Sequence, residues 1–213
     1  MLTPAFKRSM QYTKAYLMPG PGGNGSTDIR DETGRAITLR NIPYIATDVA
    51  KICKVIVFNN LSEQDIVYGA SDDWMFPGDF TVQCFARQVS NADQILFMHD
   101  STSGVKWGIE IVSSIRAFAC LGGSVLDVSG LSISAGQWYH WCIERSGTTT
   151  RFYKDGYVVG SGSDAGVVGN NTGALYVGSF AGSLKWNGYI EMFKVDKGRA
   201  LYNGAFTPPT RRF

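Results

Sequence analysis

The sequence predicts an all-β domain, either a sandwich or a barrel, and three observations lead to that prediction. Charged residues make up only 18% of the 213 residues, whereas 25 residues are glycine. About a dozen short apolar or alternating segments follow one another, with turn residues between them. No segment after residue 17 has the apolar periodicity of a helix. Low charge combined with many glycines and aromatic residues is typical of short strands joined by tight turns.

The N-terminal segment differs from the rest of the chain. Residues 1–17 mix basic and apolar side chains without a turn that would tie them into a hairpin, which predicts a short helix or an extended arm. The Pro- and Gly-rich run over 19–26 then ends any regular structure. We therefore expect a short docking arm over residues 1–17 and one domain over residues 18–213.

The first strands of the domain are predicted from short apolar runs at 36–40, 52–58 and 65–69. The segment 79–88 alternates more regularly. One of its faces carries Phe80, Val82, Cys84 and Ala86. We expect this face to be buried against the strands near 138–143.

The clearest hairpin lies further along the chain. It joins 151–154 to 157–160 through Asp155-Gly156, a pair that favours a type I′ turn because both central residues of that turn need positive φ. The remaining strand-like segments lie at 94–99, 105–112, 115–120, 137–145, 174–179 and 187–195.

Charge and hydropathy exclude several classes of partner. A net charge of +2 provides no strong basic field for nucleic acid or an anionic membrane. No apolar run approaches the ~20 residues of a membrane-spanning helix. No apolar region follows Lys7 and Arg8, so a signal peptide is not expected.

The four cysteines lie far apart, without the close ligand pair that a structural zinc site requires. Each lies in an apolar, strand-like segment, which indicates four buried thiols in a reducing cytoplasm. A single disulfide between Cys84 and Cys142 is the alternative.

Residues 136–162, GQWYHWCIERSGTTTRFYKDGYVVGSG, resemble the central hairpin of laminin G-like domains, which belong to the concanavalin A-like lectin/glucanase superfamily. The segments 78–82, 175–178 and 187–191 are similar to strands of that family and come in the same order. The resemblance implies a jelly-roll β-sandwich over roughly 18–213.

The C-terminal residues indicate which group of laminin G-like domains the chain resembles. The ending KGRALY followed by FTPP, at 197–202 and 206–209, resembles the version of this domain found in tailed-bacteriophage virion proteins. Because the fold carries lectins, glycosidases, adhesins and inert spacers, the resemblance alone does not fix the function.

A glycosidase is the least favoured function. Relatives that are glucanases carry Glu-x-Asp-x-Glu on one strand, and glycoside hydrolysis needs two neighbouring carboxylates. Glu191 is followed by Met192 and Phe193, and Glu110 has no second acid two residues away. Glu63 and Asp65 are two apart but lie beside a loop. We therefore expect that the protein is not an enzyme.

Calcium and saccharide are the ligands that the resemblance implies. Related domains hold Ca²⁺ at a rim of loops through Asp, Asn and carbonyl oxygens, although Asp and Asn are also ordinary turn residues. The candidate metal ligands are Asp72, Asp73, Asp100, Asn170 and Asn171. A saccharide site needs an exposed aromatic ring beside polar groups, and core packing is the alternative for each tryptophan. The candidate saccharide-binding residues are Trp107, Tyr157, Trp186 and Asn187.

We expect a non-enzymatic bacteriophage virion structural protein, assembled in the host cytoplasm. A capsid decoration or head-fibre subunit suits a chain of this size better than a complete tail fibre. Such a protein contacts other virion proteins and forms a homo-oligomer. The alternative is a glycan-binding tail adhesin that recognises host-surface polysaccharide, and a glycoside hydrolase is the least favoured reading.

Overall fold

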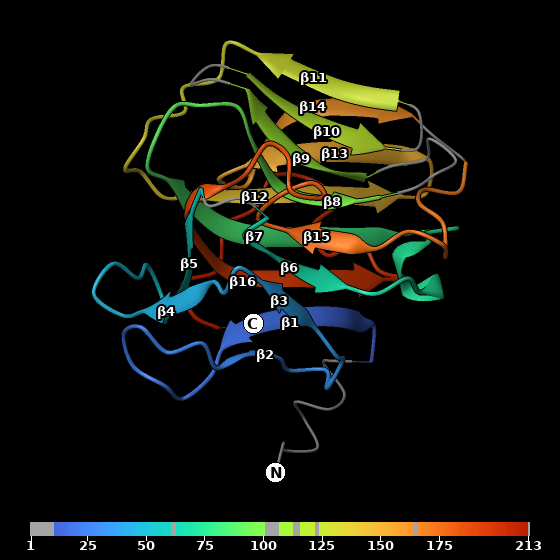
Figure 1. Cartoon of the computed structure of the whole chain (residues 1–213). Coiled ribbons are helices and arrows are strands. Elements are labelled where there is room, and N and C mark those ends of the chain that lie inside the picture. The colour runs from blue at the N-terminus through green and yellow to red at the C-terminus, as the bar shows by residue number, and fades with distance from the viewer. Residues whose placement is uncertain are drawn as a thin grey trace.

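The computed structural model consists of two antiparallel β-sheets packed face to face (Figure 1). It describes residues 11–60, 63–100, 107–112, 116–121, 124–163 and 166–212, and of 116–121 and 124–125 only the backbone. The helical element among these residues is one 3-10 turn, η1 (Asp72–Trp74). The predicted all-β jelly-roll sandwich is confirmed.

The nine-stranded sheet has the order β14-β13-β12-β7-β16-β1-β2, and β5 also pairs with β16 and with β4. In chain order its strands are β1 (Thr13–Pro19), β2 (Ile29–Asp31), β4 (Tyr44–Ala46), β5 (Val55–Asn59), β7 (Phe80–Gln88), β12 (Tyr139–Ser146), β13 (Thr149–Lys154), β14 (Tyr157–Ser163) and β16 (Asn187–Lys197).

The seven-stranded sheet has the order β11-β10-β9-β8-β15-β6-β3. Its strands are β3 (Thr38–Arg40), β6 (Asp65–Tyr68), β8 (Gln94–His99), β9 (Trp107–Val112), β10 (Arg116–Leu121), β11 (Ser124–Ser129) and β15 (Leu175–Val177).

The described residues include no helix that is long and apolar enough to span a bilayer.

The expected boundary between an arm and a domain is wrong for residues 13–17. These residues form most of β1, which lies inside the nine-stranded sheet between β16 and β2. Ala15 and Leu17 are fully buried in the core, so this segment is part of the sandwich. Residues 1–10 lie outside the described residues, and their role as a docking arm stays a prediction.

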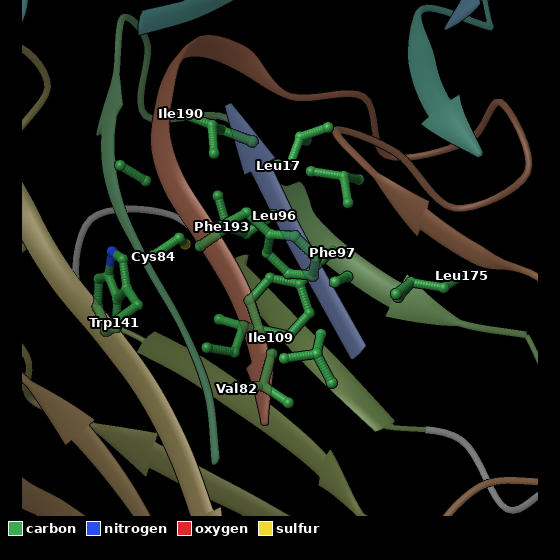
Figure 2. Packing of buried hydrophobic residues seen from close by; sticks show 14 of the residues in the cluster. Leu17, Val82, Cys84, Leu96, Phe97, Ile109, Trp141, Leu175, Ile190 and Phe193 are labelled. Carbon is green, nitrogen blue, oxygen red and sulfur yellow. The ribbon is translucent and has the colours of Figure 1, made fainter. Parts of the chain in front are cut away.

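The core forms between the sheets, and the expected face of β7 points into it. Phe80, Val82, Cys84 and Ala86 all belong to the main buried cluster. Their expected packing partner is wrong, because β12 pairs directly with β7 in the same sheet. The opposite layer is supplied by residues such as Leu96, Phe97 and Ile109 of the other sheet, which lie among the same buried side chains (Figure 2).

The other face of β7 is also covered. The C-terminal segment, residues 199–206, lies along it, with the Tyr202 hydroxyl donating to Gln83 Oε1 at 2.6 Å. The Phe206 amide donates to the Gly156 carbonyl at the β13–β14 turn. Both central residues of that turn have positive φ, +52° at Asp155 and +82° at Gly156, as the type I′ prediction requires.

The described cysteines are free thiols, so the bridge between Cys84 and Cys142 is absent. Cys84 lies opposite Trp141 across the sheet, and Cys142 lies opposite Gln83, which places the two thiols on opposite faces. Cys53 is only half-buried, which corrects the expectation of complete burial. The Cys120 side chain lies outside the described residues.

Candidate functional site

Two of the predicted saccharide-binding residues are core residues, which corrects that prediction for them. Trp107 is fully buried, stacks on His99 with ring centroids 5.6 Å apart, and donates its indole N–H to the Trp74 carbonyl. Trp186 is only 1% exposed. Neither ring offers a face on which a sugar could stack, because other side chains already cover it.

The other two candidates lie at separate places. Tyr157 is 72% exposed at the start of β14, in the hairpin turn. Asn187 begins β16, where its backbone N–H donates to Gln94 Oε1 and its side chain lies 3.5 Å from Ser90 Oγ. The Tyr157 ring is therefore exposed and could contact a ligand. Asn187 instead joins β16 to the β7–β8 loop and the start of β8 through hydrogen bonds.

The predicted metal ligands are only partly brought together. Asn171 Nδ2 donates to Asp72 Oδ1 at 2.8 Å, which joins the loop before β15 to η1. Asp73 turns instead to the guanidinium of Arg35 and, at 3.8 Å, to Lys14 Nζ. Two cations in contact with Asp73 compete with a metal ion for its carboxylate.

The other two predicted metal ligands, Asn170 and Asp100, make hydrogen bonds that hold the loops containing them. Asn170 Oδ1 accepts from the Thr172 and Gly173 amides, and the Asp100 amide donates to the Ala174 carbonyl. No group of three or more His, Cys, Asp or Glu residues that could hold a metal occurs within the described residues. Calcium binding at this rim of loops stays a prediction.

Buried carboxylates carry structural hydrogen bonds. Glu144 is fully buried and accepts from three consecutive amides, those of Leu201, Tyr202 and Asn203. Glu191 is fully buried as well and accepts from the amides of residues 51–53. Each carboxylate thereby anchors a loop to the outer face of the nine-stranded sheet.

Two further acids considered for hydrolysis are Asp65 and Glu110. Asp65 is buried and bound by Arg40 and by the Ser179 hydroxyl. Glu110 is half-buried on β9, and burial, followed by the charge of Asp93, raises the pKa of its carboxyl. A raised pKa on one carboxyl does not provide the second group that glycoside hydrolysis requires.

A row of side chains on the outer face of the nine-stranded sheet is the strongest candidate site. Tyr44 on β4 lies opposite Val57 on β5, and Val57 lies opposite Tyr189 on β16. Tyr189 in turn lies opposite Arg87 on β7. We call these four residues, Tyr44, Val57, Tyr189 and Arg87, the aromatic row. Directly paired residues of neighbouring strands share a face, so the row crosses four strands on the side away from the core.

Polar loops border the Tyr44 end of the aromatic row. A groove of about 280 Å³ is lined by Tyr44, Val57 and Tyr189 together with Asn24 and Asp48. The 20–26 loop is held against β4 by two backbone hydrogen bonds, from Gly25 to Ile45 and from Ile45 to Ser26. The groove thus combines phenol rings with an amide and a carboxylate.

The opposite end of the aromatic row is cationic. The Arg87 guanidinium carbon lies 5.4 Å from the Tyr189 ring centroid. Trp138 approaches the same ring, with centroids 6.3 Å apart. Lys51 Nζ lies 5.2 Å from the ring of Phe85, which precedes Arg87 by two residues on the same face of β7.

Sequence reasoning missed this site. The strand containing Tyr44 is only three residues long, which is too short for an alternating pattern to identify it. The sequence places Tyr189 on a strand without indicating on which face of the sheet its side chain lies. The neighbouring core residue Ile190 gives that face, because side chains alternate along a strand and Tyr189 therefore points outward.

Residues 62–207 match a family model described as the concanavalin A-like lectin/glucanases superfamily. No curated protein is similar in sequence at a significant level.

Solved structures share the fold at low sequence identity. The binding domain of Paraclostridial Mosquitocidal Protein 1 is 16% identical, with a TM-score of 0.68 over 89% of this chain and 49% of that chain. The Botulinum neurotoxin serotype G binding domain is 11% identical, with a TM-score of 0.66 over 89% of this chain and 48% of that chain. The present chain thus spans about half the length of these two binding domains.

A third structure matches along nearly its whole length. It is domain 4 of AbnA, a GH43 extracellular arabinanase from Geobacillus stearothermophilus, in complex with arabinotriose. It is 18% identical, with a TM-score of 0.64 over 92% of this chain and 96% of that chain. At such identities the likeness establishes the fold.

Proposed function

The chain belongs to the concanavalin A-like lectin/glucanases superfamily, and from that premise we propose that it is a non-enzymatic, lectin-like binding protein of a bacteriophage virion. Its ligand is a saccharide, and its binding site is the aromatic row with the adjoining groove. The observation that carries the proposal is the row itself: two tyrosine rings and polar loop residues on one accessible face.

The chemistry of the groove suits a sugar. A sugar ring has an apolar C–H face that packs on an aromatic ring, and hydroxyl groups at its edge that need hydrogen-bond partners. Tyr44 and Tyr189 offer partly exposed rings, and Asn24 and Asp48 are exposed polar groups beside them.

The engaged carboxylates support a non-enzymatic role. A general acid or a nucleophile needs an oxygen that can approach the scissile bond. Glu144 and Glu191 are fully buried and already accept three backbone amides each, and Asp65 is held by Arg40. These carboxylates are therefore committed to holding the fold.

The virion context rests on the resemblance of the C-terminal residues to phage proteins. We place the chain on the capsid as a decoration or head-fibre subunit, assembled in the host cytoplasm in contact with other virion proteins and with copies of itself. A tail adhesin is the second candidate, and the aromatic row favours it because an adhesin must recognise a host-surface glycan.

The saccharide-binding part is tested with purified protein and a panel of bacterial surface polysaccharides. We expect saturable binding to a subset of the panel, and loss of that binding in Tyr189→Leu, which removes the flat ring but keeps an apolar side chain. Tyr157→Leu is the matched control, since Tyr157 is an exposed tyrosine outside the row. An equal loss in both variants, or loss only in Tyr157→Leu, contradicts the assignment of the site.

The virion part is tested separately, by immunogold labelling of particles purified from cells that carry the gene. Regularly spaced labels on the capsid support a decoration or head-fibre subunit, whereas label on the tail supports the adhesin. Particles that contain none of the protein contradict both placements and leave the saccharide-binding test unaffected.

A further inference from the structure

We propose that the aromatic row selects an acidic saccharide, whose carboxylate pairs with Arg87. This inference rests on the proposed saccharide-binding function and adds the charge class of the ligand and the residue that recognises it.

Arg87 is a cation without an ionic partner. No carboxylate in the described part of the chain lies within ion-pairing distance of its guanidinium, and its Nε is a buried donor that has no hydrogen-bond acceptor. Its contact with the Tyr189 ring provides no carboxylate or carbonyl acceptor. Because the Nε is covered by the protein, a ligand reaches the guanidinium at its two Nη groups. Their paired N–H donors match a carboxylate, which accepts two parallel hydrogen bonds from an arginine.

Among the described residues, Arg87 differs from other arginines that contact aromatic rings. Other arginines that pack on rings also bind acids or carbonyls: Arg35 lies over Trp74 and binds Asp73, and Arg40 lies over Tyr176 and binds Asp65. Arg87 repeats the ring contact without the acid. The missing acid is the group that the ligand supplies.

Positive and negative side chains lie at opposite ends of the aromatic row. Arg87 and Lys51 lie at the β7 end, and the buried carboxylate of Glu191 is already bound by the amides of residues 51–53. Asp48 lies at the β4 end, where it can accept hydrogen bonds from sugar hydroxyls. A saccharide with its carboxylate toward β7 and its hydroxyls toward β4 is complementary to this pattern.

The length of the row fits an oligosaccharide. It crosses from β4 to β7 through β5 and β16, which are three strand-to-strand steps. At about 4.8 Å for each step the row is roughly 14 Å long. One sugar ring covers only part of this span, so a chain of sugars with at least one carboxylate is the ligand class that uses the whole row.

The test compares polygalacturonate with its fully methyl-esterified form, because esterification removes the charge and keeps the sugar backbone. Hyaluronate and polysialic acid extend the panel to other carboxylate sugars. We expect at least one acidic polymer to bind, with an affinity about tenfold or more above its neutral counterpart and weaker binding as salt is raised.

Two substitutions of Arg87 test whether this residue causes the preference for the acidic polymer. Arg87→Ala should lower affinity for the acidic polymer about tenfold or more and erase the preference over the ester, and Arg87→Lys should restore it only in part, because lysine lacks the bidentate fork. Arg211→Ala removes an exposed cation elsewhere and should change nothing. Melting curves establish that each variant is folded.

The outcomes separate this inference from the function on which it rests. Equal binding of acid and ester, abolished by Tyr189→Leu and unaffected by Arg87→Ala, overturns the acidic selectivity and keeps the saccharide site. An acidic preference that Arg211→Ala abolishes as fully as Arg87→Ala overturns the role of Arg87. Absence of binding to every acidic and neutral polysaccharide by the folded protein overturns both proposals.

Discussion

Replacing Glu144 with glutamine should loosen the C-terminal segment from the sheet. Glu144 Oε2 accepts from the amides of Leu201 at 2.6 Å and Tyr202 at 2.7 Å. Its Oε1 accepts from the Asn203 amide at 2.7 Å and from the Tyr153 hydroxyl at 3.1 Å. A glutamine side chain keeps only one acceptor oxygen, so its NH₂ group must face at least one of these backbone donors.

The magnitude follows from these contacts. In the less costly orientation the NH₂ faces the Asn203 amide, which leaves one buried donor unsatisfied at a cost of about 1–3 kcal/mol. The two bonds retained by the oxygen from Leu201 and Tyr202 lose their ionic character, at about 1 kcal/mol each. The sum is about 3–5 kcal/mol, which lowers the melting temperature by roughly 6–20 °C for a domain of this size.

Urea unfolding of the wild type and Glu144→Gln measures the difference directly, and hydrogen exchange locates it at the amides of residues 201–203. Glu32→Gln is the matched control, because Glu32 makes a surface ion pair with Arg212 at 3.6 Å and its loss should cost less than about 1 kcal/mol. A Glu144→Gln protein with wild-type stability and wild-type protection of those three amides would refute the reasoning.

Three further predictions concern stability. Burial lowers the pKa of His140 to about 3 and that of His99 to about 4, below the ordinary value of 6.5. A depressed imidazole pKa makes protonation favour the unfolded chain, so the free energy of unfolding should fall as the pH drops below about 6.5, by about 2 kcal/mol per histidine at pH 5. Urea titrations at pH 7.5 and pH 5 measure this, and equal values contradict it. Gly156→Ala should lower the melting temperature, since φ is +82° and the added Cβ would lie 1.9 Å from the Phe206 carbonyl oxygen; an unchanged melting curve argues against that contact. Deleting residues 1–17 should abolish folding by removing most of β1, which circular dichroism measures; a folded 1–17 deletion shows that β1 is dispensable.

Most strands could be predicted because their patterns are local. The alternation at 79–88 identified β7 and its core face, and Asp155-Gly156 identified the hairpin, since such a turn depends on the φ preferences of two adjacent residues. The short strand β2 has no comparable pattern. The strand β1 was missed because it is buried on both faces and does not alternate.

The candidate site could not be predicted because it is assembled across the sheet. Tyr44, Val57, Tyr189 and Arg87 become neighbours only through the pairing of four strands, and strand order is not a local property of the sequence. The prediction that Trp107 and Trp186 bind saccharide is wrong for a related reason. A large aromatic residue is equally suited to a core and to a sugar platform, and only the tertiary structure separates the two roles.

The most direct test of the central claim is a crystal structure of the protein with a short oligosaccharide of whichever acidic polymer binds: polygalacturonate, hyaluronate or polysialic acid. We expect sugar rings packed on Tyr189, with a carboxylate within hydrogen-bond distance of the Arg87 guanidinium. A saccharide bound at the loops of Asp72 and Asn171, or at the Tyr157 hairpin, with the aromatic row left bare, would contradict it.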